Sequence, residues 1–162
     1  MNYPLIKIEN DISLVSFINS WSKQYAYSNE STYHNSISKK EFTTTDIQNL
    51  YVWKNGMRLS EPKQKSLDIK IKDKLSLINN FKSKNEMDLQ AFKKEFKNVS
   101  AVWKIFLLHI INPNKYPIYD QHIHRTFLFI HKEDYNNISN TSITDKNKEK
   151  FYFDRYLPFI EA

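Results

Sequence analysis

The residue types best suited to chemistry lie together in residues 118–125, Ile-Tyr-Asp-Gln-His-Ile-His-Arg. Asp120 opens a predicted helix, and His122 and Arg125 follow it. A carboxylate in this place can act as a general base or stabilise positive charge that develops on a substrate. It can instead only cap its own helix, which is worth about 1 kcal/mol. The first interpretation requires a pocket beside Asp120, whereas the second does not.

A metal site is a further interpretation of this segment, because Asp120, His122, His124 and His131 are all possible ligands. His122 and His124 are two residues apart on a predicted helix and point to different faces, while Asp120 and His124 share a face without a third ligand. The absence of cysteine excludes thiolate metal sites, disulfides and a cysteine nucleophile. We expect no metal ion and no other cofactor.

The elements that would position Asp120 resemble those of the helix-hairpin-helix DNA glycosylase superfamily. In that family a Gly-Val-Gly hairpin leads into a buried helix, a short loop and the motif Val-Asp-Thr-His-Val-x-Arg. Here Asn98-Val99-Ser100 precedes a nearly continuous apolar stretch, and the Asp120 segment follows it. The resemblance covers residues 96–131 and implies that Asp120 is the catalytic aspartate. We expect His122 to pack and hydrogen-bond within the fold and Arg125 to pair with a carboxylate or a helix end.

The resemblance implies a protein that flips a modified or mispaired base out of DNA and hydrolyses its N-glycosidic bond. Cleavage of that bond builds positive charge on the sugar, which a carboxylate near C1′ stabilises. Aromatic side chains stack on the flipped base in its pocket. The candidates of suitable type are Trp53, Trp103, Tyr116 and Tyr119.

Two positions depart from the family pattern. Val102 stands where the bifunctional enzymes have their Schiff-base lysine, and Lys104 lies on another side of the same predicted helix, so we expect no lyase reaction. Asn98 and Ser100 replace the glycines that let backbone amides approach a DNA phosphate. Phosphate contact would then depend largely on four lysines, and affinity should fall steeply with salt. These lysines are Lys93, Lys94, Lys97 and Lys115.

The distribution of charge also favours DNA as a partner. Residues 61–132 hold 14 basic and 7 acidic side chains, residues 1–60 hold 6 and 5, and residues 133–162 hold 4 and 6. The positive field therefore falls on the segment that contains Asp120. A chain rich in lysine and asparagine throughout can acquire this charge from genome composition alone. Two alternatives stay open: a catalytically inactive DNA-binding module, such as one from a defence or mobile element, and a helical protein-interaction domain.

Composition indicates one all-α domain that spans residues 1–162. Hydrophobic residues make up 40% of the chain, and the single glycine, Gly56, leaves few of the tight turns that a β-sandwich or barrel requires. No apolar stretch is long enough to span a membrane, and the first residues do not resemble a signal peptide. We expect a cytoplasmic protein that does not bind membranes. The sequence leaves its oligomeric state open.

Apolar periodicity and capping patterns predict about seven helices. The first is capped by Asn10 or Asp11 and has an apolar face from Leu14 to Tyr25, and a loop over residues 28–44 follows it. The next predicted helices begin at a capping box over residues 45–48, at Ser60, and at a second box over residues 83–86. The others are an apolar helix over residues 99–111, one from Asp120 to about His131, and, after a loop over residues 133–143, an aromatic-rich one capped by Thr144 or Asp145.

Overall fold

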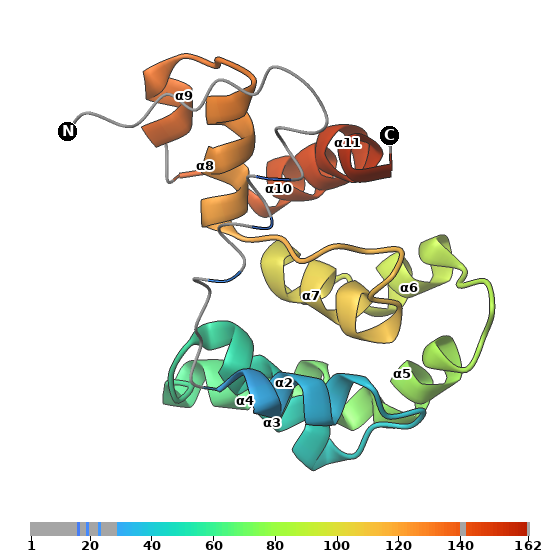
Figure 1. The fold of residues 1–162 in the computed structure, drawn as a ribbon. Coiled ribbons are helices and arrows are strands. Elements are labelled where there is room, and N and C mark those ends of the chain that lie inside the picture. Colours follow the sequence, from blue (N-terminus) through green and yellow to red (C-terminus); the bar gives the residue numbers. More distant parts are fainter. Residues whose placement is uncertain (1–15, 17–18, 20–22, 24–28, 140–141, 162) are drawn as a thin grey trace.

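Every regular element in the described part of the chain is a helix. A computed structural model describes residues 16, 19, 23, 29–139 and 142–161 (Figure 1). No strand occurs among these residues, so the all-α prediction is confirmed. The predicted helix with the apolar face from Leu14 to Tyr25 lies outside the described residues. Within them, no helix is both long and apolar enough to cross a membrane.

The helices follow one another with short connections. The first five are α2 (Glu30–Ile37), α3 (Thr44–Asn55), α4 (Glu61–Lys70), α5 (Leu75–Lys82) and α6 (Leu89–Glu95). The next five are α7 (Ala101–Ile111), α8 (Gln121–Ile130), α9 (Tyr135–Ser139), α10 (Asp145–Phe151) and α11 (Leu157–Glu161). A 3-10 turn, η1 (Lys72–Lys74), precedes α5, and a π-helical segment, η2 (Tyr152–Tyr156), joins α10 to α11.

The apolar helix α7 lies at the centre of the fold. Its residues from Lys104 to Ile111 are all buried, which confirms the prediction of a helix enclosed on most sides. Figure 1 shows α2 to α5 on one side of α7 and α8 to α11 on the other. The Tyr51 hydroxyl of α3 donates to the Trp103 carbonyl oxygen (3.0 Å), and Lys104 pairs with Glu149 of α10 (2.6 Å). Both sides are thus bonded to α7.

The helix predicted to run on from Ser60 is interrupted. At Ile71 the backbone (φ −124°, ψ −58°) leaves the helical region, and η1 then turns the chain into α5. Leu67, Ile71 and Ile78 are nevertheless all fully buried. The apolar spacing therefore identified these core side chains correctly. The change of direction at η1 lets α4 and α5 both pack on the same core.

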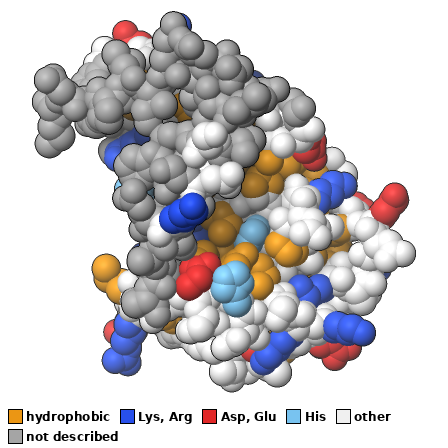
Figure 2. Space-filling model, in the orientation of Figure 1, with side chains coloured by type: hydrophobic (Ala, Val, Ile, Leu, Met, Phe, Trp, Pro, Cys, Tyr) orange, Lys and Arg blue, Asp and Glu red, His pale blue; other side chains and the backbone are white. Residues whose placement is uncertain are grey.

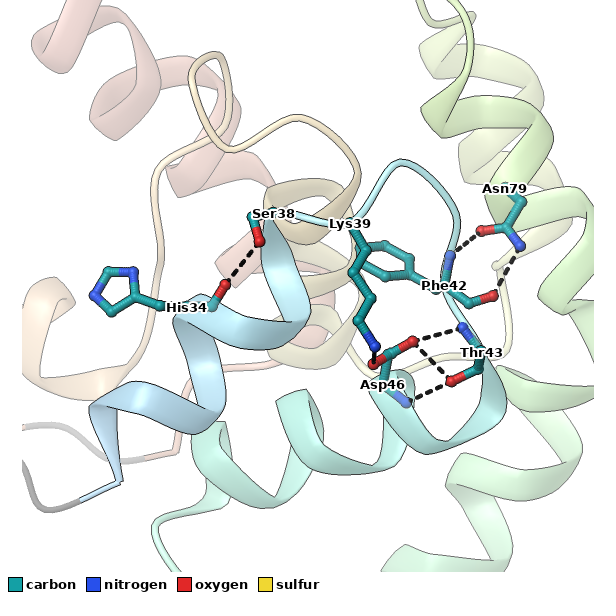
Figure 3. A network of polar contacts seen from close by, with 7 residues as sticks. All are labelled: His34, Ser38, Lys39, Phe42, Thr43, Asp46 and Asn79. Carbon is teal, nitrogen blue, oxygen red and sulfur yellow. Dashed lines mark hydrogen bonds and ion pairs between the residues drawn. The ribbon is translucent and has the colours of Figure 1, made fainter.

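The capping box of α3 uses other residues than the sequence pattern suggested. Thr43 is the N-cap, and its hydroxyl oxygen accepts from the Asp46 amide (3.2 Å), while the Asp46 carboxylate accepts from the Thr43 amide (2.8 Å). Lys39 pairs with the other carboxylate oxygen of Asp46 at 2.6 Å (Figure 3). The predicted box over residues 45–48 is therefore wrong, because Asp46 is buried and is satisfied by residues before the helix.

A side chain of α5 attaches that helix to the start of α3. The Asn79 side chain accepts from the Phe42 amide and donates to the Phe42 carbonyl oxygen, both at 2.9 Å (Figure 3). This pair of bonds satisfies the backbone just before the cap of α3. At the other end, Gly56 adopts the left-handed conformation (φ 73°) and ends α3, as predicted.

Two predicted loops contain helices. In α2, within residues 28–44, Tyr33 and Ile37 pack against the core, and the Tyr33 ring lies 4.3 Å from the Trp53 ring. In α9, within residues 133–143, Ile138 packs on the core. Polar composition concealed both helices, because each is short and needs only one or two apolar side chains to attach it.

The starts of α6 and α10 agree in part with the starts predicted from the sequence. Helix α6 begins at Leu89 and is capped by Asp88, so the predicted box over residues 83–86 is wrong. Thr144 caps α10 as predicted, through a bond from the Asn147 amide (3.3 Å). The aromatic residues that follow are mainly core, as expected: Phe151, Tyr152 and Tyr156 are buried.

Substitutions at the start of α3 test the observed cap. Thr43→Ala should lower the free energy of unfolding by about 1 kcal/mol, because it removes an acceptor for the Asp46 amide. Thr45→Ala, in the predicted box, should change it by less than about 0.5 kcal/mol. Urea denaturation followed by circular dichroism measures both values, and a larger loss for Thr45→Ala would contradict the assignment of Thr43 as the cap.

Candidate functional site

A pocket of about 460 Å³ lies where the end of α3, the start of α7 and the start of α8 come together, with α10 beside them. On the face shown in Figure 2, hydrophobic side chains gather near the centre with histidines beside them, and lysine and arginine side chains lie around this area. Its lining includes the side chains of Lys54, Lys63, Trp103, Asp120, Arg125 and Lys148.

Asp120 is both a helix cap and a pocket residue. Its Oδ1 accepts from the amides of His122 (2.8 Å) and Ile123 (3.0 Å), which is the capping interaction expected for an aspartate before α8. Its Oδ2 lies 2.9 Å from Lys54 Nζ, and 32% of its side chain is exposed. The two interpretations of Asp120 are thus compatible, because one carboxylate oxygen caps the helix and the other belongs to an ion pair.

The surroundings of Asp120 keep it ionised. Burial on its own raises the pKa of the carboxyl, but the amides of Ile123 and His122 and the Lys54 ammonium outweigh burial and hold the pKa below its usual value. A carboxylate in this state can stabilise positive charge or accept a proton at neutral pH.

Lys54 is the main pocket residue that the sequence did not indicate. It stands in the last turn of α3, 66 positions before Asp120, and only 9% of its side chain is exposed. A lysine in the last turn of a helix is common because it interacts favourably with the helix dipole. No local pattern therefore distinguished Lys54, and only the packing of α3 against α7 brings it to Asp120.

Next to Asp120, a buried tyrosine and histidine form one wall. The Tyr119 hydroxyl lies 2.9 Å from His124 Nδ1, and both side chains are buried. Burial, together with the positive charges of Arg155, Lys148 and Arg125, lowers the pKa of His124, so this imidazole is neutral at neutral pH. Burial, with the Asp120 charge, raises the pKa of Tyr119. The pair is therefore an uncharged, rigid support for the start of α8.

His122 and Arg125 are placed differently from their expected structural roles. Both line the pocket, His122 is exposed, and Arg125 is half-buried. Among the described residues, the His122 side chain makes no hydrogen bond and Arg125 forms no ion pair. His122 and Arg125 thus supply polar groups to the pocket, and neither makes the expected bond within the described part of the fold.

Only two of the four candidate aromatic residues lie at the pocket. Trp103 and Tyr119 line it, although Tyr119 is almost fully buried. Trp53 packs between the rings of Tyr33 (4.3 Å) and Phe106 (6.2 Å). Tyr116 is buried elsewhere, and its carbonyl oxygen accepts from His109 Nδ1 (2.7 Å). Trp103 is therefore the candidate stacking surface.

His109 is satisfied within the core, as expected. Because Nδ1 donates to a carbonyl, Nε2 of the neutral ring is free to accept from the Tyr33 hydroxyl at 2.6 Å. Nowhere in the described ranges are three histidine, aspartate or glutamate side chains grouped so that they could hold a metal ion.

The four candidate phosphate-binding lysines lie outside the pocket lining. Lys93 Nζ sits 3.7 Å from the centre of the Phe153 ring, and Lys115 lies over Tyr116 at 5.8 Å. Lys94 and Lys97 are exposed on α6 and the turn after it. Among the described residues, four other cations line the pocket, namely Lys54, Lys63, Arg125 and Lys148, and Asp120 is the one acidic residue that does so.

The turn between α6 and α7 forms without glycine. The Val99 amide donates to the Phe96 carbonyl oxygen (3.0 Å), and Ser100 occupies the N-cap position of α7 with ordinary dihedral angles (φ −59°, ψ 151°). Within the described residues, positive φ occurs only at Gly56 and Lys132, so Asn98 needs no left-handed conformation. Asn98 is exposed, whereas Ser100 lines the pocket.

Val102 and Lys104 face different sides of α7, as their spacing on a helix predicts. Val102 lines the pocket, and Lys104 points away from it to pair with Glu149. Lys104 therefore cannot provide an amine to this pocket.

No family model matches the chain, and no curated protein or solved structure matches it significantly. The functional argument consequently depends on the pocket itself. Its defining feature is one ionised carboxylate among basic side chains and a tryptophan.

The ion pair gives Asp120→Asn a pH-dependent effect on stability. Asparagine caps helices about as well as aspartate, but it cannot pair with Lys54, so the variant should be less stable at neutral pH. Because folding lowers the pKa of Asp120, its contribution is present above the unfolded value of about 3.9 and is lost as the pH falls through the folded value. The difference between wild type and variant in urea denaturation should therefore shrink below about pH 4.

Asp88→Asn is the matched control for this measurement. Asp88 accepts from two amides of α6, both at 2.9 Å, and has no lysine partner among the described residues. Its substitution should cost less at neutral pH. A difference for Asp120→Asn that stayed constant down to the acid limit would contradict the assigned ion pair.

Proposed function

We propose that the chain is a DNA glycosylase-like hydrolase that cleaves the N-glycosidic bond of a modified or mispaired base, with Asp120 as the reacting carboxylate. The observation that carries the proposal is the pocket in which the ionised Asp120 carboxylate shares space with Trp103 and basic side chains. A flipped base requires a surface for stacking, and the DNA backbone around it favours positive charge.

In this reaction the bond between C1′ and the base nitrogen breaks, and its electron pair leaves with the base, which takes up a proton. Positive charge develops on the sugar, and the Asp120 carboxylate stabilises it. The oxygen of a water molecule bonds to C1′, and Asp120 accepts the proton that the water loses. Val102 provides no amine, which favours hydrolysis by water over lyase chemistry.

Lys54 would keep the Asp120 carboxylate ionised and oriented. A carboxylate has about four acceptor sites, of which the two amides and the Lys54 ammonium use three. One site is left for a water molecule. The Tyr119 and His124 pair supports the same helix start and is a positioning element, since neither side chain is required to react.

Base excision is tested with duplexes that carry uracil, oxidised guanine, alkylated purines or bulky modified cytosines. After incubation, alkali should reveal strand breaks at abasic sites, and Asp120→Asn should reduce their formation by at least about a hundredfold. Asp88→Asn, which alters a cap away from the pocket, should retain activity. Excision that Asp120→Asn leaves unchanged would refute the mechanism.

A second candidate is a DNA-binding module without catalysis. The observation that favours it is the Lys54 ion pair, because the ammonium neutralises the charge that the reaction would use. This candidate predicts DNA affinity that is indifferent to Asp120→Asn and no abasic sites with any substrate. Absence of DNA affinity at low salt would leave the helical protein-interaction domain as the remaining hypothesis.

Both DNA-binding candidates predict a salt-dependent affinity with a contribution from exposed lysines. Lys94→Gln combined with Lys97→Gln should weaken binding and reduce the slope of log affinity against log salt by about 2. Lys70→Gln, an exposed lysine on α4, is the control and should leave the slope unchanged. Fluorescence anisotropy with a labelled duplex at several salt concentrations measures the slope, and an equal loss in the control would indicate nonspecific attraction only.

A further inference from the structure

The four cations that line the pocket differ in their hydrogen-bond and ion-pair partners. Lys54 is bonded to Asp120, and Lys63 Nζ donates to the Asn55 side-chain oxygen at 2.7 Å. Arg125 has no ion pair within the described residues. Lys148 lies 3.7 Å from a carboxylate oxygen of Asp145, a side chain that is 53% exposed and therefore a weak partner.

Arg125 and Lys148 belong to the same wall of the pocket. One stands on α8 and the other on α10, and both side chains are half-buried. The charges of both act on the His124 imidazole, which lines the pocket with them. Two positive groups with little compensation thus face the pocket, and the one acid that lines it in the described part of the chain is bonded to Lys54.

We infer that this wall binds a phosphate group, so that the pocket takes a nucleoside monophosphate unit. Arg125 and Lys148 hold the phosphate, the sugar lies beside Asp120, and the base lies against Trp103 and Val102. The orientation of the nucleotide in the pocket rests on the proposed function. The inference narrows the ligand from a base to a whole nucleotide.

A phosphate is the chemical group that fits this wall best. Guanidinium binds phosphate with two parallel hydrogen bonds, and lysine adds a point charge. A neutral base alone would leave two partly desolvated cations without an anion, which is unfavourable. The pocket volume of about 460 Å³ lies within the usual range for small-molecule sites.

Isothermal titration calorimetry on the full chain tests the phosphate wall with thymidine, thymidine 5′-monophosphate and inorganic phosphate. The monophosphate should bind at least about tenfold more tightly than thymidine. Arg125→Gln combined with Lys148→Gln should remove that advantage and leave thymidine binding unchanged. The matched control, Arg58→Gln with Lys150→Gln, removes one arginine and one lysine outside this pocket and should keep the advantage.

The nucleotide unit can be free or can belong to a strand. Short oligothymidylates with and without a 5′-phosphate distinguish these sources. Preference for the free monophosphate assigns the site to nucleotides, and preference for a phosphorylated strand assigns it to strand ends or extruded nucleotides. Equal binding of thymidine and its monophosphate, or an advantage that survives Arg125→Gln with Lys148→Gln, would overturn the inference.

The same titration with Asp120→Asn separates this inference from the proposed reaction. The variant should bind the monophosphate at least as tightly as the wild type, because the phosphate wall is intact and a neighbouring negative charge is gone. Monophosphate binding without base excision would refute the proposed function and support the phosphate wall. Base excision without any preference for the monophosphate would support the proposed function and refute the phosphate wall.

Discussion

The burial of α7 is the constraint on which the rest of the structure depends. A helix that is apolar on nearly every side cannot face water, so the segments before and after it must enclose it. The enclosing helices are bonded to α7 near both ends, through Tyr51 at Trp103 and through Lys82 Nζ, which donates to the Ile110 carbonyl oxygen at 3.0 Å. The pocket lies at the start of α7, where Val102 and Trp103 meet polar side chains from the end of α3 and the start of α8.

The pocket combines structural and chemical demands on a few residues. Asp120 caps α8 with one oxygen and meets Lys54 with the other, so the interaction that defines the helix start also orients the carboxylate. The uncharged Tyr119 and His124 pair supports this arrangement from within the core. Charge in the pocket therefore has two separate sources: the ion pair between Lys54 and Asp120, and the weakly compensated cations Arg125 and Lys148.

Local signals predicted what depends on local interactions. The apolar helix around α7, the cap at Asp120 and the end of α3 at Gly56 all follow from neighbouring residues, and the structure contains them. Lys54 and Lys148 were not predicted, because nothing near either residue shows that it faces Asp120. Capping boxes were assigned in the wrong register at α3 and α6, since several polar residues in a row satisfy the same pattern and only packing selects one.

The ion pair between Lys54 and Asp120 has a consequence for how the chain folds and for how proteolysis would affect the pocket. Its partners come from helices on opposite sides of α7 and are 66 positions apart in sequence. Closing so long a loop costs entropy that is recovered only when the intervening helices are packed. We therefore expect the site to form late in folding, and we expect a protease cut that releases either side from α7 to dismantle it without touching a pocket residue.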